Sequence, residues 1–369
     1  LYVLLAGYLG IRLYMLFGYF LPLLLQNKLI FTAIILFLAF FYIVIRIIYR
    51  NLNDVPPAGL YYFASSVMAL FLVMVVLTVA FDILLLFARV LPSVDAYIHS
   101  HMAFVGVLYL AVVVAVYAAG IFNANNSAVS QYDIVLDNTL PQDIKIVMVS
   151  DIHVTSYTRK ASMQKLVEKI NGQDADVVVF VGDMIDGEQK PYEDKDIASI
   201  FKGIKSRYGV YGVLGNHEYY GEGIDSALEV LSESGITMLR EDVAVIDALN
   251  LAIIGRDDLG APRFGFERKD MADLSSGLEE RAVLVLDHQP QDAMKAKDGG
   301  ADVQLSGHTH NGQIFPGNLI VKAIYDNPWG HKAYENFHLI VSCGYGTWGP
   351  PIRTRSFSEI VVLNLKAQN

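Results

Sequence analysis

The sequence of 369 residues contains a single cysteine, Cys343, and very few charged side chains in its first third. One cysteine excludes a disulfide framework within the chain, and its scarcity fits either side of a membrane. The chain also lacks a basic excess, because 28 lysines and arginines stand against 38 aspartates and glutamates. A surface that binds nucleic-acid phosphates needs the opposite balance, so we expect no nucleic-acid partner.

The few charges are unevenly distributed along the chain. Residues 1–125 hold five basic and three acidic side chains, a net charge of +2. Subtracting these from the totals leaves 23 basic and 35 acidic side chains in residues 126–369, a net charge of −12. The overall 53% of hydrophobic residues is therefore a blend of two compositions. It predicts a membrane domain over 1–125, a linker over 126–143 and an acidic soluble domain over 144–369.

Four apolar runs in the first domain have the length of transmembrane helices, since a bilayer core of about 30 Å takes roughly 20 residues. Backbone polar groups in lipid must bond within the segment, so these runs are predicted to be helical. No run carries a polar stripe, which argues against buried helices of a soluble protein. We expect a multi-pass four-helix bundle in the cell (plasma or inner) membrane, with runs at 2–20, 29–48, 60–87 and 104–122.

Three charged residues, Arg12, Asp82 and Arg89, lie in or beside these runs. Charges at membrane depth are costly and often functional, although long side chains also reach the interface. An internal pair of Arg12 with Asp82 is favoured over a functional role, with Arg89 reaching the interface. Basic residues are balanced between the two sides, so the positive-inside rule leaves the orientation of the soluble domain open.

The remainder of the chain alternates short apolar runs with helical stretches such as 162–171 and 224–234. This alternation predicts an α/β domain in which two packed sheets are flanked by helices. Buried strands are predicted at 145–150, 177–181, 210–214, 282–286 and 303–305, with two more near the end of the chain at 338–342 and 359–365.

Ligand-type side chains follow each of the first five predicted strands. The segments are DIH at 151–153, GDMIDG at 182–187, GNHE at 215–218, DHQP at 287–290 and GHTHNG at 307–312. They contain five of the nine histidines. A single segment of this kind is usually a polar turn, but open α/β sheets bind their ligands at strand ends. All five together predict one site.

Histidine, aspartate and asparagine ligands without a thiolate suit two ions of Mn, Fe, Zn or Co. Two such ions about 3.5–4 Å apart share a bridging carboxylate, lower the pKa of water and neutralise a phosphoryl group. A histidine nearby that is not a ligand can protonate the departing oxygen. The residue types therefore predict hydrolysis of a phosphoester by attack of a metal-activated hydroxide.

Taken together, the five motifs resemble those of the calcineurin-like metallophosphoesterases, over roughly 144–365. The segment GYGTWGPPIR at 344–353 is similar to the closing segment of a bacterial branch with N-terminal membrane helices. The resemblance implies a two-sheet sandwich that binds two divalent metal ions. It implies one ion on Asp151, His153 and His310, a bridging Asp183, and a second ion on Asn216, His288 and His308.

The resemblance also implies that His217 is the general acid. Three acidic residues look like orienters of the ligands, although plain loop polarity explains each nearly as well: Asp186, Glu218 and Asp287. The protein-phosphatase branch carries the motif GDxxDRG, which contains an arginine, whereas here Gly187 is followed by Glu188. This departure argues against a phosphoprotein phosphatase. Arg353 would either contact the substrate phosphate or brace its own loop.

These patterns predict a membrane-embedded metallophosphoesterase that acts on a phosphorylated lipid or a lipid-linked pyrophosphate, since four spans exceed what an anchor needs. Some relatives in the wider group hydrolyse the pyrophosphate bond of lipid A precursors. Two alternatives stay open: a non-catalytic membrane receptor or scaffold that retains the metal site, and a phosphodiesterase for a small soluble nucleotide with a membrane anchor. Aromatic residues within 315–337 predict a membrane-facing rim, or else a packed loop: Tyr325, Trp329, Tyr334 and Phe337.

Overall fold

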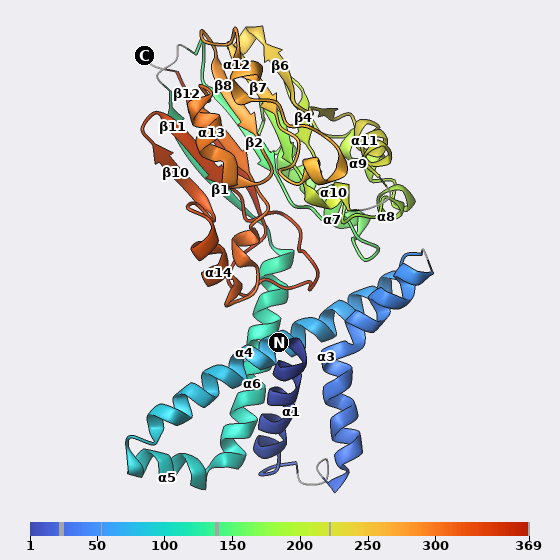
Figure 1. The fold of residues 1–369 in the computed structure, drawn as a ribbon, viewed down its shortest axis with the longest axis vertical. Helices are drawn as coiled ribbons and strands as arrows, with labels where there is room; N and C mark the ends of the chain where they lie inside the picture. Colours follow the sequence, from blue (N-terminus) through green and yellow to red (C-terminus); the bar gives the residue numbers. More distant parts are fainter. Residues whose placement is uncertain (22–25, 53, 137–139, 221–222, 368–369) are drawn as a thin grey trace. The chain divides into compact units, whose positions relative to one another are not determined.

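The computed structural model describes residues 1–21, 26–52, 54–136, 140–220 and 223–367. The chain divides into two compact units. The first comprises Leu1–Phe122 and Gly349–Thr354, and the second comprises Asn123–Trp348 and Arg355–Asn369. Figure 1 shows the helices and strands of each unit.

Apolar helices make up the first unit. Three of them, α3, α4 and α6, are long and apolar enough to cross a membrane, and α1 is apolar but only 16 residues long. The predicted four apolar helices are thus present, and within the described residues three of them have the length of a full span. A short polar helix, α5, precedes α6. The bounds are α1 Tyr2–Phe17, α3 Lys28–Asn51, α4 Ala58–Ala88, α5 Pro92–Ser100 and α6 Met102–Asn125.

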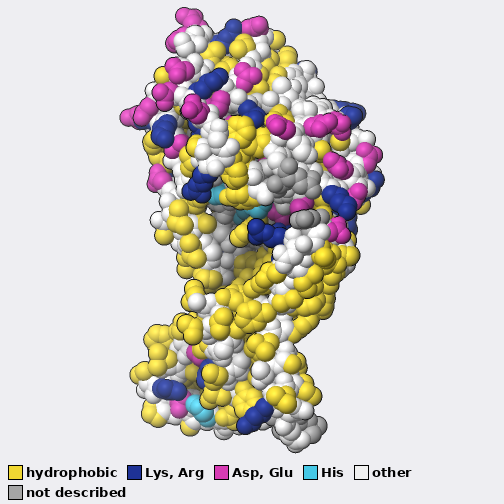
Figure 2. All heavy atoms as spheres, turned by 45° about the vertical axis from the view of Figure 1, so that its right-hand side comes forward, with side chains coloured by type: hydrophobic (Ala, Val, Ile, Leu, Met, Phe, Trp, Pro, Cys, Tyr) yellow, Lys and Arg dark blue, Asp and Glu magenta, His cyan; other side chains and the backbone are white. Residues whose placement is uncertain are grey.

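The outward faces of these helices are hydrophobic. Only 22%, 28% and 22% of the most apolar stretch of α3, α4 and α6 is buried inside the protein. Figure 2 shows hydrophobic side chains over most of the visible surface of this unit, while acidic and basic side chains gather on the α/β unit. A helix that faces water carries a polar outer face. The outer faces of these helices therefore suit lipid.

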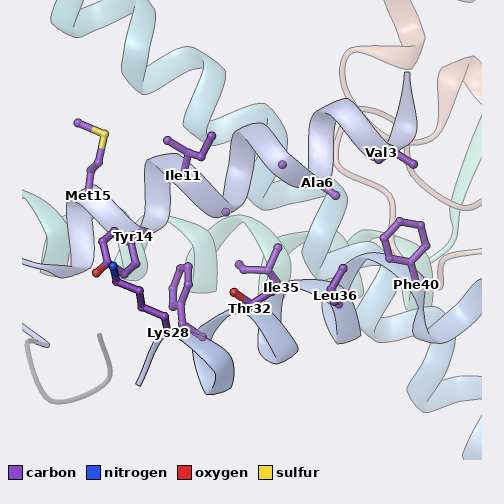
Figure 3. A pocket seen from close by; sticks show the side chains of 13 residues that line it. Val3, Ala6, Ile11, Tyr14, Met15, Lys28, Thr32, Ile35, Leu36 and Phe40 are labelled. Atoms are coloured by element: carbon purple, nitrogen blue, oxygen red, sulfur yellow. The ribbon is translucent and has the colours of Figure 1, made fainter. Parts of the chain in front are cut away.

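A groove of about 460 Å³ runs between α1 and α3. Its lining is mostly aliphatic and aromatic, with Gly7 and Gly10 on the α1 side. Figure 3 shows Lys28 and Tyr14 together at one end of the groove and Phe40 at the other. The small residues keep α1 from filling the space, and the lining suits hydrocarbon.

The charged residues predicted to pair within the bundle do so. Arg12 donates from Nε and Nη2 to Oδ1 of Asp82, at 3.0 Å and 2.5 Å, and the hydroxyl of Tyr8 donates to Oδ2 at 2.7 Å. The pair joins α1 to α4. It confirms the interpretation of Arg12 and Asp82 as an internal ion pair.

Removing one member of this pair is expected to destabilise the helical unit more than removing both. Arg12→Leu leaves the carboxylate of Asp82 without its cation, at a cost of about 2 kcal/mol. The double variant Arg12→Leu, Asp82→Leu removes the uncompensated charge and should recover most of that loss. Thermal unfolding in detergent micelles measures both. Equal losses in the single and double variants would contradict the pairing.

The second unit contains two sheets, as predicted, and each of them has six strands. The strand order is β1-β12-β2-β3-β4-β5 in the first sheet and β10-β11-β9-β8-β7-β6 in the second. Strands β2 to β5 pair in parallel, and so do β7, β8, β9 and β11. The strands are β1 Ala128–Val135, β2 Ile144–Val149, β3 Val177–Val181, β4 Val210–Val213, β5 Thr237–Met238, β6 Asp242–Ile246, β7 Leu251–Gly255, β8 Ala282–Leu286, β9 Val303–Ser306, β10 Gly330–Tyr334, β11 Phe337–Val341 and β12 Glu359–Lys366.

Alternating side chains of the buried strands build three apolar layers. One layer lies between the sheets, where β2, β3, β7, β8, β9 and β12 contribute valine, isoleucine and leucine. The other two layers pack helices onto the outer faces of the sheets. These helices are α7 Lys160–Asn171, α8 Lys190–Asp194, α9 Ile197–Phe201 and α11 Ile224–Ser232 on the first sheet, and α12 Met271–Ser275 and α13 Ala293–Asp298 on the second.

The prediction of a linker over 126–143 is wrong for most of its described length. Residues 128–135 form β1, which pairs in parallel with β12 along its whole length. The strand starts three residues after α6 ends at Asn125. It escaped sequence analysis because an edge strand alternates apolar and polar side chains, and only Ile134 of this strand is buried. Residues 137–139 of the predicted linker lie outside the described residues.

Candidate metal centre

Five loops meet at the carboxyl ends of β2, β3, β4, β8 and β9, and each carries ligand-type side chains. Parallel strands end on the same edge of a sheet, so residues far apart in sequence converge there. Several of these residues have left-handed backbone, which is unusual outside glycine. They are Asp151, His153, Asp183, His308 and His310, with φ between 49° and 69°. Such conformations cluster at functional sites.

One group of side chains joins the first strand of the site to the last. Asp151 and His153 follow β2, and His310 follows β9. His153 Nε2 lies 3.0 Å from His310 Nε2, and His310 Nε2 lies 3.4 Å from Asp151 Oδ1. All three side chains are buried. The ligand atoms of these three side chains lie close enough together to bind one ion.

A second group lies beside the first. Asp183 follows β3, His288 follows β8 and His308 follows β9. His288 Nε2 is 3.2 Å from Asp183 Oδ2. Asn216, at the start of α10 (Asn216–Tyr219), places its Oδ1 2.9 Å from His308 Nδ1. These four residues are the predicted ligands of the second ion.

Asp183 faces both groups. Its Oδ1 accepts the backbone N–H of His217 at 2.9 Å, which fixes the carboxylate. Its Oδ2 lies 3.2 Å from His288 Nε2 and 3.7 Å from His153 Nε2. An oxygen between two sets of imidazoles is in the position of a bridging ligand.

The residues fit two divalent cations. Two ligands about 2.1 Å from one ion at angles of about 90–110° stand roughly 3.0–3.4 Å apart, and the distances within both groups have this spacing. His288 Nε2 is buried and faces the Asp183 carboxylate, while the Nδ1 of the same ring lies 2.9 Å from the carbonyl of Val181. Histidines that bind a metal through one ring nitrogen typically donate the other ring N–H to a carbonyl or a carboxylate, as Nδ1 of His288 is placed to do.

The charges of the site favour cations. Burial alone would raise the pKa of Asp183, but the imidazoles of His288, His217 and His153 hold the pKa of that carboxyl well below its ordinary value. Burial lowers the pKa of His288, and the Asp183 carboxylate outweighs it and raises the pKa well above the ordinary value.

His217 lies next to this centre and is held by Asp186. Its Nδ1 is 2.8 Å from Asp186 Oδ1, and the same oxygen lies 3.2 Å from His153 Nδ1. Burial lowers the pKa of His217, but the hydrogen bond to Asp186 and the charge of Asp183 raise it to about 9. Burial raises the pKa of Asp186, but the hydrogen bonds from His153 and His217 outweigh this effect and lower the pKa to about 2. Asp186 therefore orients a ligand-type histidine and His217 together.

Glycines at two loops are required by close approach. A Cβ on Gly215 would meet Asp183 Oδ1 at 2.2 Å, and a Cβ on Gly307 would meet Asp151 Oδ2 at 2.3 Å. Any side chain at either position would push an aspartate out of the centre. The glycines of the GNHE and GHTH motifs thus let the loops reach the carboxylates.

Glu218 supports the site through the backbone. Its buried carboxylate accepts N–H groups from Asp183 at 3.0 Å, Ile185 at 2.9 Å and Gly215 at 2.7 Å. Burial and the charge of Asp183 raise the pKa of Glu218 to about 7. The side chain ties the loop after β3 to the loop after β4.

Glu218→Ala is expected to lower the stability of the α/β unit, because it leaves three buried N–H groups without an acceptor. Each such group costs about 1–3 kcal/mol, so the total should reach at least about 3 kcal/mol. The melting temperature of the purified chain measures the loss. Glu229→Ala, on the exposed face of α11, is the matched control. If the Glu218→Ala chain had the same melting temperature as this control, the stabilising role of the Glu218 carboxylate would be contradicted.

Asp287 and Arg353, two other predicted residues, lie in different surroundings. Asp287 is buried, and Arg268 Nη2 donates to its Oδ2 at 2.5 Å. Burial raises the pKa of Asp287 to about 6 against the effect of Arg268. Arg353 belongs to the helical unit, where its side chain is fully buried and its backbone N–H donates to the carbonyl of Gly120.

Sequence analysis missed a buried polar network beside His288. The carboxylate of Asp258 accepts two hydrogen bonds from Gln289 Nε2, at 3.0 Å and 2.9 Å, and one from the N–H of Gly260. Arg268 lies between Asp287 and Glu241. The glutamine in the DHQP motif was a signal for this network, whereas Asp258 and Arg268 stand in segments without a recognisable pattern.

The prediction of an aromatic rim is wrong for Phe337, where the alternative of a packed residue holds. Phe337 is buried, and Tyr334 donates its hydroxyl to Asp326. Trp329 is partly exposed, but its Nε1 donates to Glu359 Oε1 at 3.0 Å. Tyr325 stacks edge-on near His308, with ring centroids 6.2 Å apart. The prediction of a rim rested on aromatic residues that mostly pack against, or hydrogen-bond to, other residues of the same unit.

Comparison with known proteins identifies the family of the chain. The family model for calcineurin-like phosphoesterases matches residues 144–312. An uncharacterized metallophosphoesterase of Aquifex aeolicus is 31% identical over 61% of this chain and 86% of its own length. The chain therefore belongs to the calcineurin-like metallophosphoesterase family.

Two further relatives match a similar share of this chain. An uncharacterized metallophosphoesterase of Campylobacter jejuni is 37% identical over 65% of this chain and 63% of its own length. A "transmembrane protein with metallophosphoesterase domain" of Danio rerio is 32% identical over 60% of this chain and 53% of its own length. The chain thus spans less than two thirds of these two relatives. A solved dimetal phosphatase of Danio rerio covers 61% of this chain at 14% identity, with a TM-score of 0.40.

Proposed function

We propose that this protein is a membrane-embedded dimetal phosphoesterase that hydrolyses a phosphate ester or pyrophosphate bond of a lipid or lipid-linked substrate. The observation that carries the proposal is the pair of ligand groups that share Asp183, with His217 beside them. One ion would be held by Asp151, His153, His310 and Asp183. The other would be held by Asp183, Asn216, His288 and His308.

Two divalent ions bound at these residues would supply Lewis acidity, which lowers the pKa of water and neutralises a phosphoryl group. The donor set of imidazole, carboxylate and amide suits Mn, Fe, Zn or Co. The chain itself supplies fixed geometry. Backbone N–H groups of His217 and His308 hold the carboxylates of Asp183 and Asp151, so little reorganisation is needed when an anionic group binds.

His217 is suited to protonate the leaving oxygen. Asp186 binds its Nδ1, which leaves Nε2 as the nitrogen that can give a proton. The imidazole is partly exposed while the adjacent ligands His153 and Asp183 are buried, so a substrate can reach it. A general acid of this kind typically contributes 10²–10⁴-fold to the rate, as an order of magnitude.

A lipid substrate is supported by the chain's membrane helices. The α/β unit begins directly after α6, and β1 starts at Ala128. Three extended residues reach only about 10 Å, so the phosphoesterase unit is tied close to the end of a membrane span. An enzyme held in this way meets phosphorylated lipid headgroups at high local concentration.

Two assays test the proposal. The purified chain with Mn²⁺ should hydrolyse bis-p-nitrophenyl phosphate, and inactivity with every metal would favour a receptor or scaffold. Lipid extracts of cells that lack the protein should then accumulate one phosphorylated lipid or lipid-linked pyrophosphate. Unchanged lipids together with loss of hydrolysis of a soluble nucleotide would favour an anchored phosphodiesterase and contradict the lipid substrate.

A further inference from the structure

Helix α14, Gly317–Ile324, has no buried residue although it is rich in aliphatic side chains. Leu319, Ile320 and Ile324 are 55%, 59% and 61% exposed, and Phe315 just before the helix is 43% exposed. Helices on the surface of a globular unit normally turn such residues toward the core. A contiguous exposed apolar face next to a polar surface marks an interaction site.

Helix α14 is attached firmly to the loop of the metal centre. It follows η4, the short turn His310–Gly312, and the backbones of Gly312 and Asn318 approach so closely that a Cβ on Gly312 would meet Asn318 N at 2.1 Å. Beyond the helix, Thr309 Oγ1 donates to the carbonyl of Pro328 at 2.6 Å. The loop with His308 and His310 is therefore bound to both ends of this segment.

The same segment lies at the end of the sheet where the chain arrives from α6. Strand β1 begins at Ala128, whose register partner on β12 is Glu359. The carboxylate of Glu359 accepts the indole N–H of Trp329, five residues after α14. Within the α/β unit, Figure 1 shows α14 beyond this end of the sheets. The α14 end of the unit is therefore also the end at which the chain arrives from the apolar helix α6.

An exposed tryptophan extends the apolar face toward His217. Trp348 is 58% exposed, and its loop is pinned by two hydrogen bonds with Gln313, from Trp348 N to Oε1 and from Nε2 to the carbonyl of Trp348. The ring centroids of Trp348 and His217 are 6.4 Å apart. We call Phe315, Leu319, Ile320, Ile324 and Trp348 the α14 rim.

We propose that the α14 rim inserts into the interface of the lipid bilayer beside the metal centre. Aliphatic residues, an indole and the exposed Lys322 form the composition of a helix that lies in a membrane interface. Lys322 would meet the phosphates of lipid headgroups. A rim in this position would bring a headgroup to the level of His217 without removing the lipid from the bilayer. The insertion itself is independent of which substrate the centre hydrolyses.

Depth-dependent quenching in nanodiscs tests the insertion. The whole chain with Ile320→Cys, labelled with an environment-sensitive dye, is compared with Val245→Cys, an exposed aliphatic residue on β6. The native chain is treated with the same dye as a control, to measure any labelling of the buried Cys343. We expect a blue shift at position 320 and strong loss of fluorescence with lipids that carry a spin label near the headgroup, and neither effect at position 245.

Two results would overturn the proposal. Fluorescence at position 320 that matches position 245 would place the rim in water. A blue shift without quenching by labelled lipids would place it against protein, either the chain's own helices or a second copy. The double variant Ile320→Gln, Ile324→Gln gives a further readout. It should lose the quenching at a dye on Leu319→Cys while hydrolysis of bis-p-nitrophenyl phosphate stays at the wild-type rate, whether or not the native substrate is a lipid.

Discussion

Asp183→Asn is expected to release both metal ions and to reduce hydrolysis of bis-p-nitrophenyl phosphate to background. The substitution keeps the size of the side chain and the acceptor for the N–H of His217. It removes the negative charge that faces His153 and His288. Loss of an outer partner of a metal ligand costs about 10–100-fold in activity, and loss of a ligand shared by two ions should cost far more.

A matched control lies at the other end of the same strand. Asp176 precedes β3, and its carboxylate accepts the N–H of Lys145 and pairs with Arg207. Asp176→Asn should keep the metal content and turnover of the native chain. Metal analysis by mass spectrometry and the hydrolysis rate are measured on both variants. An Asp183→Asn chain that retains two ions and native turnover would contradict its bridging position.

His217→Ala should lower turnover while leaving the metal content unchanged. His217 contributes only its backbone N–H to Asp183, and that group survives the substitution. We expect a loss of about 10²–10⁴-fold with an alkyl phosphodiester, whose leaving oxygen needs a proton. The loss should be much smaller with p-nitrophenyl esters, because nitrophenolate leaves without protonation.

The comparison of leaving groups separates an acid from a structural residue. A His217→Ala chain with equal losses on both esters would show that the imidazole acts by positioning alone. Asp186→Asn is the companion variant, since it leaves His217 in place but removes the carboxylate that binds Nδ1. It should give an intermediate loss of about 10–100-fold.

The sequence was sufficient to predict that the five motif loops share one site, because carboxyl ends of parallel strands lie on one edge whatever the details of the loops. Asp151 and His310 are an example: they are 159 positions apart and their side chains lie 3.4 Å from each other. The apolar helices were predictable for a similar reason, since lipid imposes a length and a composition.

Other features depend on three-dimensional contacts that no local pattern records. The left-handed backbone of Asp151 and His153 follows from close packing of neighbouring loops. The three N–H groups on Glu218 come from two different loops, so the residue looks like any polar residue of a turn. Edge strand β1 was missed because it buries almost nothing of its own.

At the α14 rim, the sequence pattern suggests burial where the structure shows exposed residues. The helical spacing of Leu319, Ile320 and Ile324 is typical of a helix that packs on a core. The aromatic residues nearby were the basis for the prediction of a rim. The structure leaves the aliphatic residues exposed and uses Trp329 to hold the loop to β12. Sequence periodicity identifies an apolar face but does not identify what covers it.

The central claim is that the five loops hold two divalent ions that are needed for hydrolysis of a phosphoester. The most direct test is the metal content of the purified chain, measured together with turnover before and after chelation. The claim predicts two ions per chain, loss of turnover when they are removed, and recovery on addition of Mn²⁺. A chain that binds fewer than two ions when saturated, or that turns over equally well after their removal, would contradict it.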